Sequence, residues 1–263
     1  LARRAWATAL AGLGVSPLLL ISDLGRPARF LNMLRMFKVT SPMSVGSWIL
    51  SASSATTGVA AAHAWFGVFP RLSRGARPLA ALLGLPLSTY TAALIANTAV
   101  PVWHEARRTL PYVFAAGAGL SAGAAVTAFT PPEKAGSARR LGLAGSVAEL
   151  AAQQVMKRRL GDHAASYERS APKRFEQAAQ AGLLAGTALV AVRGRTSRAA
   201  ATAGAALMLA GALATRWSIY KAGFASASDP QAVIGPQRAA IRADARAGAA
   251  RTRPRAPATG TAG

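Results

Sequence analysis

The stretch ISDLGRPARFLNMLRMFKVTSPMSVGSWIL, residues 21–50, lies between two strongly apolar segments of the chain. Its charged residues are four cations and one carboxylate: Arg26, Arg29, Arg35, Lys38 and Asp23. A chain that crosses a bilayer needs about 20 apolar residues for each crossing and a polar turn between crossings. The stretch therefore predicts a short basic connection between two membrane helices, and we call its residues 23–43 the elbow.

Composition places the whole chain in the same class. Of 263 residues, 52% are hydrophobic and only 15% are charged, and the mean hydropathy is +0.26. A soluble domain carries about 25% charged residues. The charges here gather in short runs between long uncharged windows, which indicates a protein of several membrane spans.

The net charge of +22 does not indicate a nucleic-acid partner. The cations lie in the gaps between apolar runs, where membrane topology places them, and the sequence has no aromatic platform, zinc-finger spacing or helix-turn-helix pattern. The chain has no cysteine, so it holds no Cys-ligated iron–sulfur cluster or zinc site. The expected surroundings are a lipid bilayer.

The sequence predicts an all-α bundle of about seven transmembrane helices within residues 1–226. A polar loop is expected at residues 157–176, and a basic tail rich in Pro, Gly and Ala, without stable structure, at 227–263. Pro86 is expected to kink the third span. The predicted spans are residues 5–22, 44–69, 79–100, 109–130, 141–156, 177–192 and 199–220.

Lysine and arginine counts suggest which side each gap faces. The gaps after the first, third and fifth spans carry twelve lysines and arginines in total, and the gaps after the second, fourth and sixth carry nine. The tail from Lys221 adds seven more. Because positive loops stay on the cytoplasmic side, the elbow and the C-terminus are predicted to be cytoplasmic.

The elbow also resembles a known family. Its opening Asp-Leu-Gly-Arg-Pro (residues 23–27) and its Ser-Pro-Met-Ser entry into the next helix (41–44) are similar to the NrfD family of polysulfide-reductase-type membrane subunits. The segments 90–108 and 220–238 resemble later helix ends of that family, so the likeness covers most of residues 1–238.

The resemblance implies a role in a bacterial cytoplasmic membrane. It implies about eight helices, so one further helix is expected before Leu1. It also implies a quinone-reactive subunit (menaquinone or ubiquinone) without haem or metal of its own. Its partners would be an iron–sulfur electron-transfer subunit and a molybdopterin catalytic subunit of a respiratory oxidoreductase.

Two residues are candidates for binding a quinone carbonyl. Tyr90 lies in the third span with a hydroxyl suited to donate a hydrogen bond, and family quinone pockets use a tyrosine on the matching helix. An interfacial or packing tyrosine is the alternative. His63 ends the second span and could bond a quinone at the outer face, or be an ordinary interfacial histidine. With His104 and His163 near loops, the three histidines do not form the facing pairs of a haem-b subunit.

Three polar residues inside spans are candidates for proton transfer or helix packing. Glu149 is the only acid well inside a span, and an intramembrane carboxylate marks by default a pathway or a partner. The alternative is a shallow position paired with Arg139 or Arg140. Gln153 follows one turn later on the same face. Asn97 cannot carry a proton, so an interhelical hydrogen bond is its expected role.

In the elbow, Asp23 is expected to pair with Arg26 or to cap the amphipathic stretch, a structural role. Two other functions stay open. A transporter or channel would show paired broken helices in corresponding halves, and only Pro86 breaks a span. A pure anchor would hold the redox partners and bind no quinone.

Overall fold

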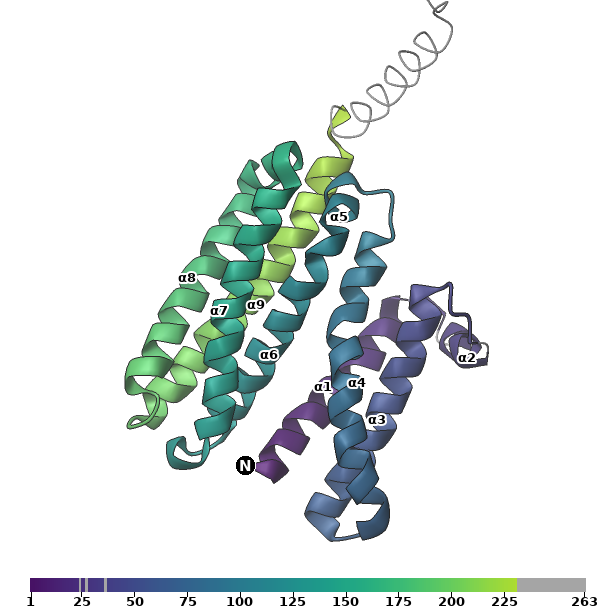
Figure 1. Ribbon diagram of the computed structural model, residues 1–263, viewed down its shortest axis with the longest axis vertical. Coiled ribbons are helices and arrows are strands. Elements are labelled where there is room, and N and C mark those ends of the chain that lie inside the picture. The colour runs from purple at the N-terminus through teal and green to yellow at the C-terminus, as the bar shows by residue number, and fades with distance from the viewer. Residues whose placement is uncertain (24, 27, 36, 231–263) are drawn as a thin grey trace, which may run out of the picture.

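The computed structural model describes residues 1–230 apart from 24, 27 and 36. Within these residues every regular element is a helix (Figure 1), which confirms the all-α fold. The predicted tail lies outside the described residues from 231 onward. The seven long helices are α1 (Ala2–Asp23), α3 (Pro42–Phe66), α4 (Pro70–Ala96), α6 (Leu110–Phe129), α7 (Gly136–Leu160), α8 (Ser170–Arg193) and α9 (Arg198–Ala227). The short elements are α2 (Ala28–Arg35), α5 (Pro101–Glu105) and the 3₁₀ turns η1 (Ala106–Arg108), η2 (Pro132–Lys134) and η3 (Gly161–Glu168).

Four of the long helices are long and apolar enough to cross a membrane: α1 over residues 2–22, α4, α6 and α9. The other three, α3, α7 and α8, have 24 or 25 residues each. At 1.5 Å per residue they are about 36 Å long, enough to span a hydrocarbon core of about 30 Å. Their serines, threonines and charges lower their hydropathy, so the count of seven crossings stays a prediction.

Two predicted connections are wrong because helices continue through charged sequence. The segment 70–78 is not a gap, since α4 begins at Pro70 and includes three arginines. The predicted loop 157–176 is mostly helical: α7 runs on to Leu160, α8 begins at Ser170, and only the short turn η3 separates them. Lysine and arginine are good helix formers, so a hydropathy pattern ends before the backbone helix does.

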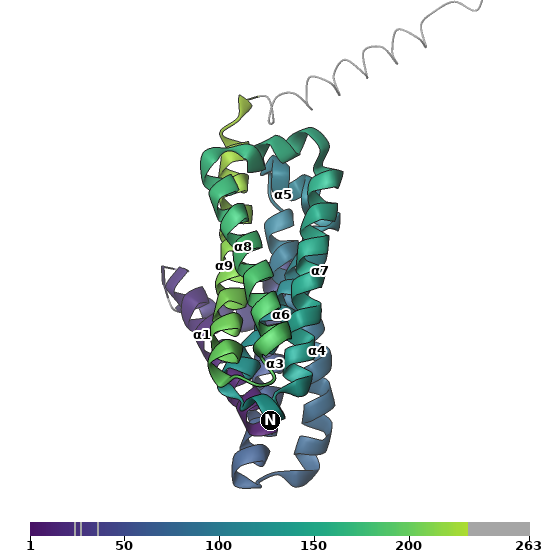
Figure 2. The same ribbon diagram turned by 90° about the vertical axis from the view of Figure 1, so that its left-hand side faces the viewer.

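The helices form two groups that lie side by side (Figures 1 and 2). Helices α6, α7, α8 and α9 make a four-helix bundle, and α1, α3 and α4 make the second group, which contacts the bundle chiefly through α4 and α6. Within the bundle, α6 and α7 approach closely at glycines. A Cβ at Gly123 would lie 2.2 Å from the Gly142 backbone nitrogen, and one at Gly145 would lie 2.3 Å from that of Leu120. Small residues of this kind let membrane helices pack backbone to backbone.

The elbow ends in a well-formed helix start. The Ser41 side chain accepts a hydrogen bond from the Ser44 backbone nitrogen, and Pro42 occupies the first turn of α3. These positions suit a serine N-cap and a proline, which lacks the donor that a first turn leaves unpaired. The Ser-Pro entry therefore fixes where the second predicted span begins.

Two cations near Leu1 reduce the charge difference used for the predicted topology. Arg3 Nε donates to the Ala64 carbonyl at the end of α3, and Arg4 Nη1 donates to the Phe129 carbonyl at the end of α6. Both arginines therefore lie at the end of the molecule opposite the elbow. The charge argument still favours a cytoplasmic elbow, by a smaller margin.

Candidate functional site

A buried carboxylate and a half-buried guanidinium lie near each other inside the four-helix bundle. Glu149, midway along α7, is 0% exposed, and the Arg216 guanidinium, on α9, lies close to its carboxylate. The Arg216 guanidinium lies 3.8 Å from the centre of the Phe114 ring, and its Nη2 donates to the Phe114 carbonyl at 3.2 Å. Glu149 is therefore neither shallow nor paired with Arg139, which instead donates to carbonyl oxygens at the ends of η2 and α8.

This pair is not fully satisfied by protein groups. Among the described residues, no hydrogen-bond partner is present for either Glu149 carboxylate oxygen or for Nη1 of Arg216. The neighbouring Thr215 hydroxyl donates to the Gly211 carbonyl oxygen at 3.1 Å. Burying a carboxylate without hydrogen bonds is costly. A buried carboxylate that is kept despite this destabilisation is a candidate for a functional residue.

Gly117 on α6 provides the space for the pair. A Cβ at this position would lie 2.6 Å from Arg216 Nη2 and 3.0 Å from Glu149 Oε2. Any larger residue would displace one of the two charged groups. Residue 117 therefore has to be glycine for the pair to keep its present arrangement.

Polar side chains continue from Glu149 toward η3. Gln153, one turn after Glu149, donates through Nε2 to Thr215 Oγ1 at 3.1 Å, which joins α7 to α9. A further turn along α7, Lys157 binds both Glu176 oxygens on α8 at 3.0 and 3.1 Å. We call Glu149, Thr215, Gln153, Lys157 and Glu176 the polar line.

A small cavity lies on the polar line between Thr215 and Glu176. Its volume is about 10 Å³, and further polar groups of its wall come from Gln153, Lys157, Tyr167 and Ser218. A cavity of about one probe sphere holds one water molecule when two to four polar partners surround it. Burial raises the pKa of Tyr167, so this side chain stays a neutral phenol.

The two residues predicted to bind a quinone lie at opposite ends of the α3–α4 pair. The Tyr90 ring packs against Gly46 near the start of α3, where a Cβ would lie 2.5 Å from it. His63 is near the end of α3, and its Nδ1 is 3.1 Å from the Val68 carbonyl oxygen. Seventeen residues of helix separate positions 46 and 63, or about 25 Å. The structure therefore does not bring Tyr90 and His63 to one ligand, and neither contacts Glu149.

The remaining predicted residues, Asn97, Arg26 and Asp23, are not part of the polar line. Asn97 caps the end of α4, where it is exposed, so the interhelical bond of its side chain stays a prediction. Arg26 is exposed in the elbow. Asp23 is the last residue of α1, but its side chain is outside the described part of the chain, and its pairing is not tested.

A large apolar groove runs between the two helix groups. Its volume is about 830 Å³, and its walls are mostly small and apolar residues of α1, α3, α4, α6 and α7. Ser53 lines it, 2% exposed, with an unpartnered hydroxyl. On α4 the wall includes Leu87, three residues before Tyr90, so the groove reaches the turn that precedes this tyrosine.

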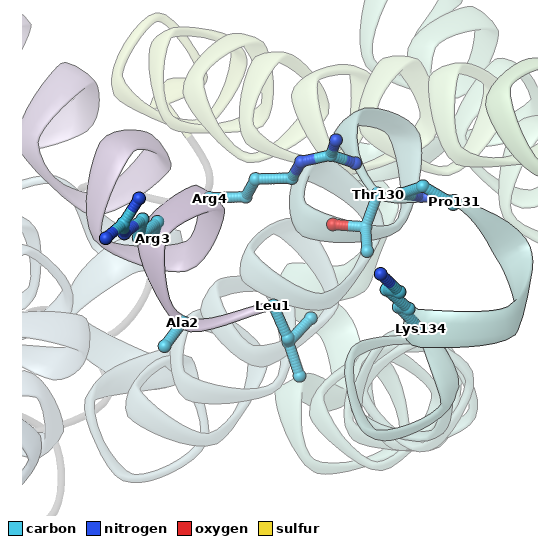
Figure 3. A pocket seen from close by; sticks show the side chains of 7 residues that line it. All are labelled: Leu1, Ala2, Arg3, Arg4, Thr130, Pro131 and Lys134. Atoms are coloured by element: carbon cyan, nitrogen blue, oxygen red, sulfur yellow. The ribbon is translucent and has the colours of Figure 1, made fainter. Parts of the chain in front are cut away.

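A second hollow, of about 390 Å³, lies at the end opposite the elbow (Figure 3). Arg3, Arg4 and Lys134 surround it together with Thr130, whose hydroxyl is buried and unpartnered. None of the residues predicted to take part in redox chemistry lines it. We therefore place the candidate functional site at the polar line and at Tyr90.

Three residues of this site were not predicted from the sequence: Arg216, Thr215 and Glu176. Arg216 stands alone among apolar residues of the seventh predicted span, which is a usable signal because intramembrane charges are rare and face protein. The spacing of Glu149, Gln153 and Lys157, four residues each, places them on one helix face. Only the fold shows that α8 and α9 supply their partners.

Comparison with known proteins agrees with the resemblance of the elbow. The model of the NrfD_2 family, described as polysulfide reductase, matches residues 1–228. No curated protein and no solved structure matches the chain. The match covers the elbow, all seven long helices and the polar line. The chain belongs to the NrfD_2 polysulfide reductase family of membrane proteins.

Proposed function

We propose that this protein is the quinone-interacting membrane subunit of a redox complex and passes electrons between the quinone pool and an iron–sulfur partner. The observation that carries the proposal is a buried, unsatisfied carboxylate beside a half-buried arginine in a chain of this family. Reduction of a quinone to a quinol takes up two protons with two electrons. A membrane subunit that supports this reaction needs a group that exchanges protons inside the bilayer.

Tyr90 is the proposed hydrogen-bond donor to a quinone carbonyl. Its ring is fixed against Gly46, and within the described residues its hydroxyl makes no hydrogen bond. The apolar groove that reaches Leu87 offers a hydrocarbon surface for an isoprenoid chain. His63 is a second proposed contact only for a separate site, because it lies at the other end of α3.

Glu149 is the proposed proton-exchanging group. Its carboxyl group is fully buried in the bundle, its oxygens have no hydrogen-bond partner among the described residues, and the Arg216 guanidinium lies nearby. A carboxyl group in this position can accept a proton and release it. Gln153 orients the neighbouring Thr215 hydroxyl, which is the role proposed for this interhelical amide.

The iron–sulfur subunit and a molybdopterin catalytic subunit are the proposed partners. They would supply the metal centres, since the chain has no cysteine. The proposed location is the bacterial cytoplasmic membrane, with the elbow, η3 and the C-terminus on the cytoplasmic side.

Tyr90→Phe is expected to raise the KM for quinone about tenfold, because one hydrogen bond of about 1.4 kcal/mol is lost. The purified complex would be assayed for turnover over a range of quinone concentrations. Tyr112→Phe is the matched control, since Tyr112 is 71% exposed on α6. Equal KM values for Tyr90→Phe and the parent would exclude Tyr90 from the quinone site.

The absence of cysteine makes the topology directly measurable. A single cysteine at Asp162, in η3, is expected to react with an impermeant maleimide only after the membrane is opened. One at Thr196, between α8 and α9, is expected to react in intact spheroplasts. The reverse pattern would invert the proposed orientation.

A further inference from the structure

We propose that protons reach Glu149 from the membrane surface at η3, along the polar line, with Glu176 as the carboxylate at its entrance and one ordered water in the cavity between Glu176 and Thr215. The inference rests on the proposed function for its coupling to quinone turnover. Beyond the proposed function, it specifies the route that protons take, the membrane surface from which they enter and the residue at the entrance.

The residues of the line are spaced for transfer over short distances. Glu149, Gln153 and Lys157 occupy positions i, i+4 and i+8 on one face of α7, so successive side chains start about 6 Å apart. Thr215 from α9 bridges to Gln153, and Glu176 from α8 bridges to Lys157. Three helices, α7, α8 and α9, thus supply the side chains of the polar line.

The exposure of these groups rises steadily toward η3. Glu149 is 0% exposed, Gln153 is 6% and Glu176 is 8%. Beyond Glu176, Lys157 Nζ also lies 3.5 Å from Glu168 Oε1, and the Glu168 side chain is 57% exposed. A row of polar side chains that is buried at one end and exposed to solvent at the other is arranged as an entry route for protons.

The cavity supplies the step that side chains alone do not make. Glu176 and Thr215 both line it, and its volume of about 10 Å³ matches a single water. Around that water are further hydrogen-bonding groups of Tyr167 and Ser218. The wall is polar enough to hold the water.

The proton balance of one transfer is closed. Glu176, a carboxylate in the ion pair with Lys157, first takes a proton from hydronium at the η3 surface. It gives this proton to the water, the water gives one of its own to Thr215 Oγ1, and the Thr215 hydroxyl gives its original proton to the Glu149 carboxylate. For this last step the hydroxyl turns from the Gly211 carbonyl toward Glu149, and it turns back afterwards. Glu176 is then a carboxylate again, so every group except Glu149 returns to its starting state.

A purely structural role for the Lys157–Glu176 pair makes a different prediction. The pair ties α7 to α8, and Gln180 also donates to Glu176 at 3.3 Å. If the ion pair mattered only for stability, removing either partner would have similar effects. If Glu176 carries protons, the two removals differ.

The test uses the complete complex with quinone turnover measured in H₂O and D₂O. Glu176→Gln is expected to lower kcat at least about a hundredfold, the low end of losses seen when a proton-transferring group is removed. It is expected to leave the KM for quinone unchanged and to raise the solvent isotope effect. Glu176→Asp is expected to restore most of kcat. Lys157→Gln breaks the same ion pair but leaves the Glu176 carboxyl group in place, so it is expected to lower thermal stability as Glu176→Gln does without raising the solvent isotope effect. Glu168→Gln removes an exposed carboxylate outside the polar line and is expected to keep kcat within about twofold of the parent.

Thr215→Val keeps the test decisive if Glu176→Gln fails to assemble. It removes the hydroxyl at constant shape and is expected to lower kcat as Glu176→Gln does, with Thr215→Ser restoring it. A parent complex that turns over normally, with both variants at the parent rate and isotope effect, would overturn the route and leave the proposed function standing. A parent complex with no quinone turnover would overturn the proposed function and the route with it.

Discussion

Glu149→Gln is expected to lower quinone-linked turnover about a hundredfold in an intact complex, because loss of a positioned proton-transfer group costs about that factor or more. Glutamine has the size of glutamate but cannot release a proton at neutral pH. Turnover of the purified complex, at saturating quinone, is the measurement.

The same substitution also removes the counter-charge of Arg216, so stability needs a separate control. Removing one partner of a fully buried charge pair costs about 3–5 kcal/mol, and we expect a smaller loss here because Arg216 is only half-buried. The double variant Glu149→Gln with Arg216→Gln removes both charges and is expected to recover thermal stability. We expect its turnover to stay low. If the double variant recovered turnover as well, Glu149 would act only as the partner of Arg216.

Gly123→Ala is expected to destabilise the bundle by about 3 kcal/mol, the upper part of the usual range for overpacking. The new Cβ would lie 2.2 Å from the Gly142 nitrogen, 2.5 Å from its Cα and 2.6 Å from the Ala138 carbonyl oxygen. All three are backbone atoms, so relief requires α6 and α7 to move apart. The measurement is the unfolding midpoint in mild detergent.

Gly119→Ala is the matched control on the same helix. A Cβ at Gly119 would meet only Leu141 Cδ1, at an ordinary 3.7 Å. Alanine favours helix over glycine by about 1 kcal/mol, so this variant is expected to be neutral or slightly more stable than the parent. Equal losses for the two variants would contradict the close α6–α7 contact.

The all-α fold and the approximate position of each long helix could be predicted from apolar run length. Helix ends could not, because Arg71 and Lys157 continue a helix as readily as apolar residues do. Hydropathy responds to the side chain, whereas helix extent depends on backbone propensity and caps. The α3 helix begins two residues before the predicted span, at a Ser-Pro pattern that is itself a cap.

The candidate site could be predicted only in part. Glu149 stands out in the sequence because an acid inside a span is rare. Its neighbours Thr215 and Arg216 are more than sixty residues away in sequence. Their approach depends on how α9 packs against α6 and on the hydrogen bond from Gln153 on α7 to Thr215. The separation of Tyr90 from His63 likewise follows from the antiparallel α3–α4 pair, which no local pattern reports.

The proposed function requires that this chain bind a quinone and work with an iron–sulfur subunit. The most direct measurement is to purify the full-length protein in a gentle detergent, identify the co-purifying subunits and quantify the extracted quinone. We predict an iron–sulfur subunit with about one quinone per complex, as expected for a single tight site. An iron–sulfur subunit without quinone would show a pure anchor, and the absence of both would contradict the proposed function and favour transport.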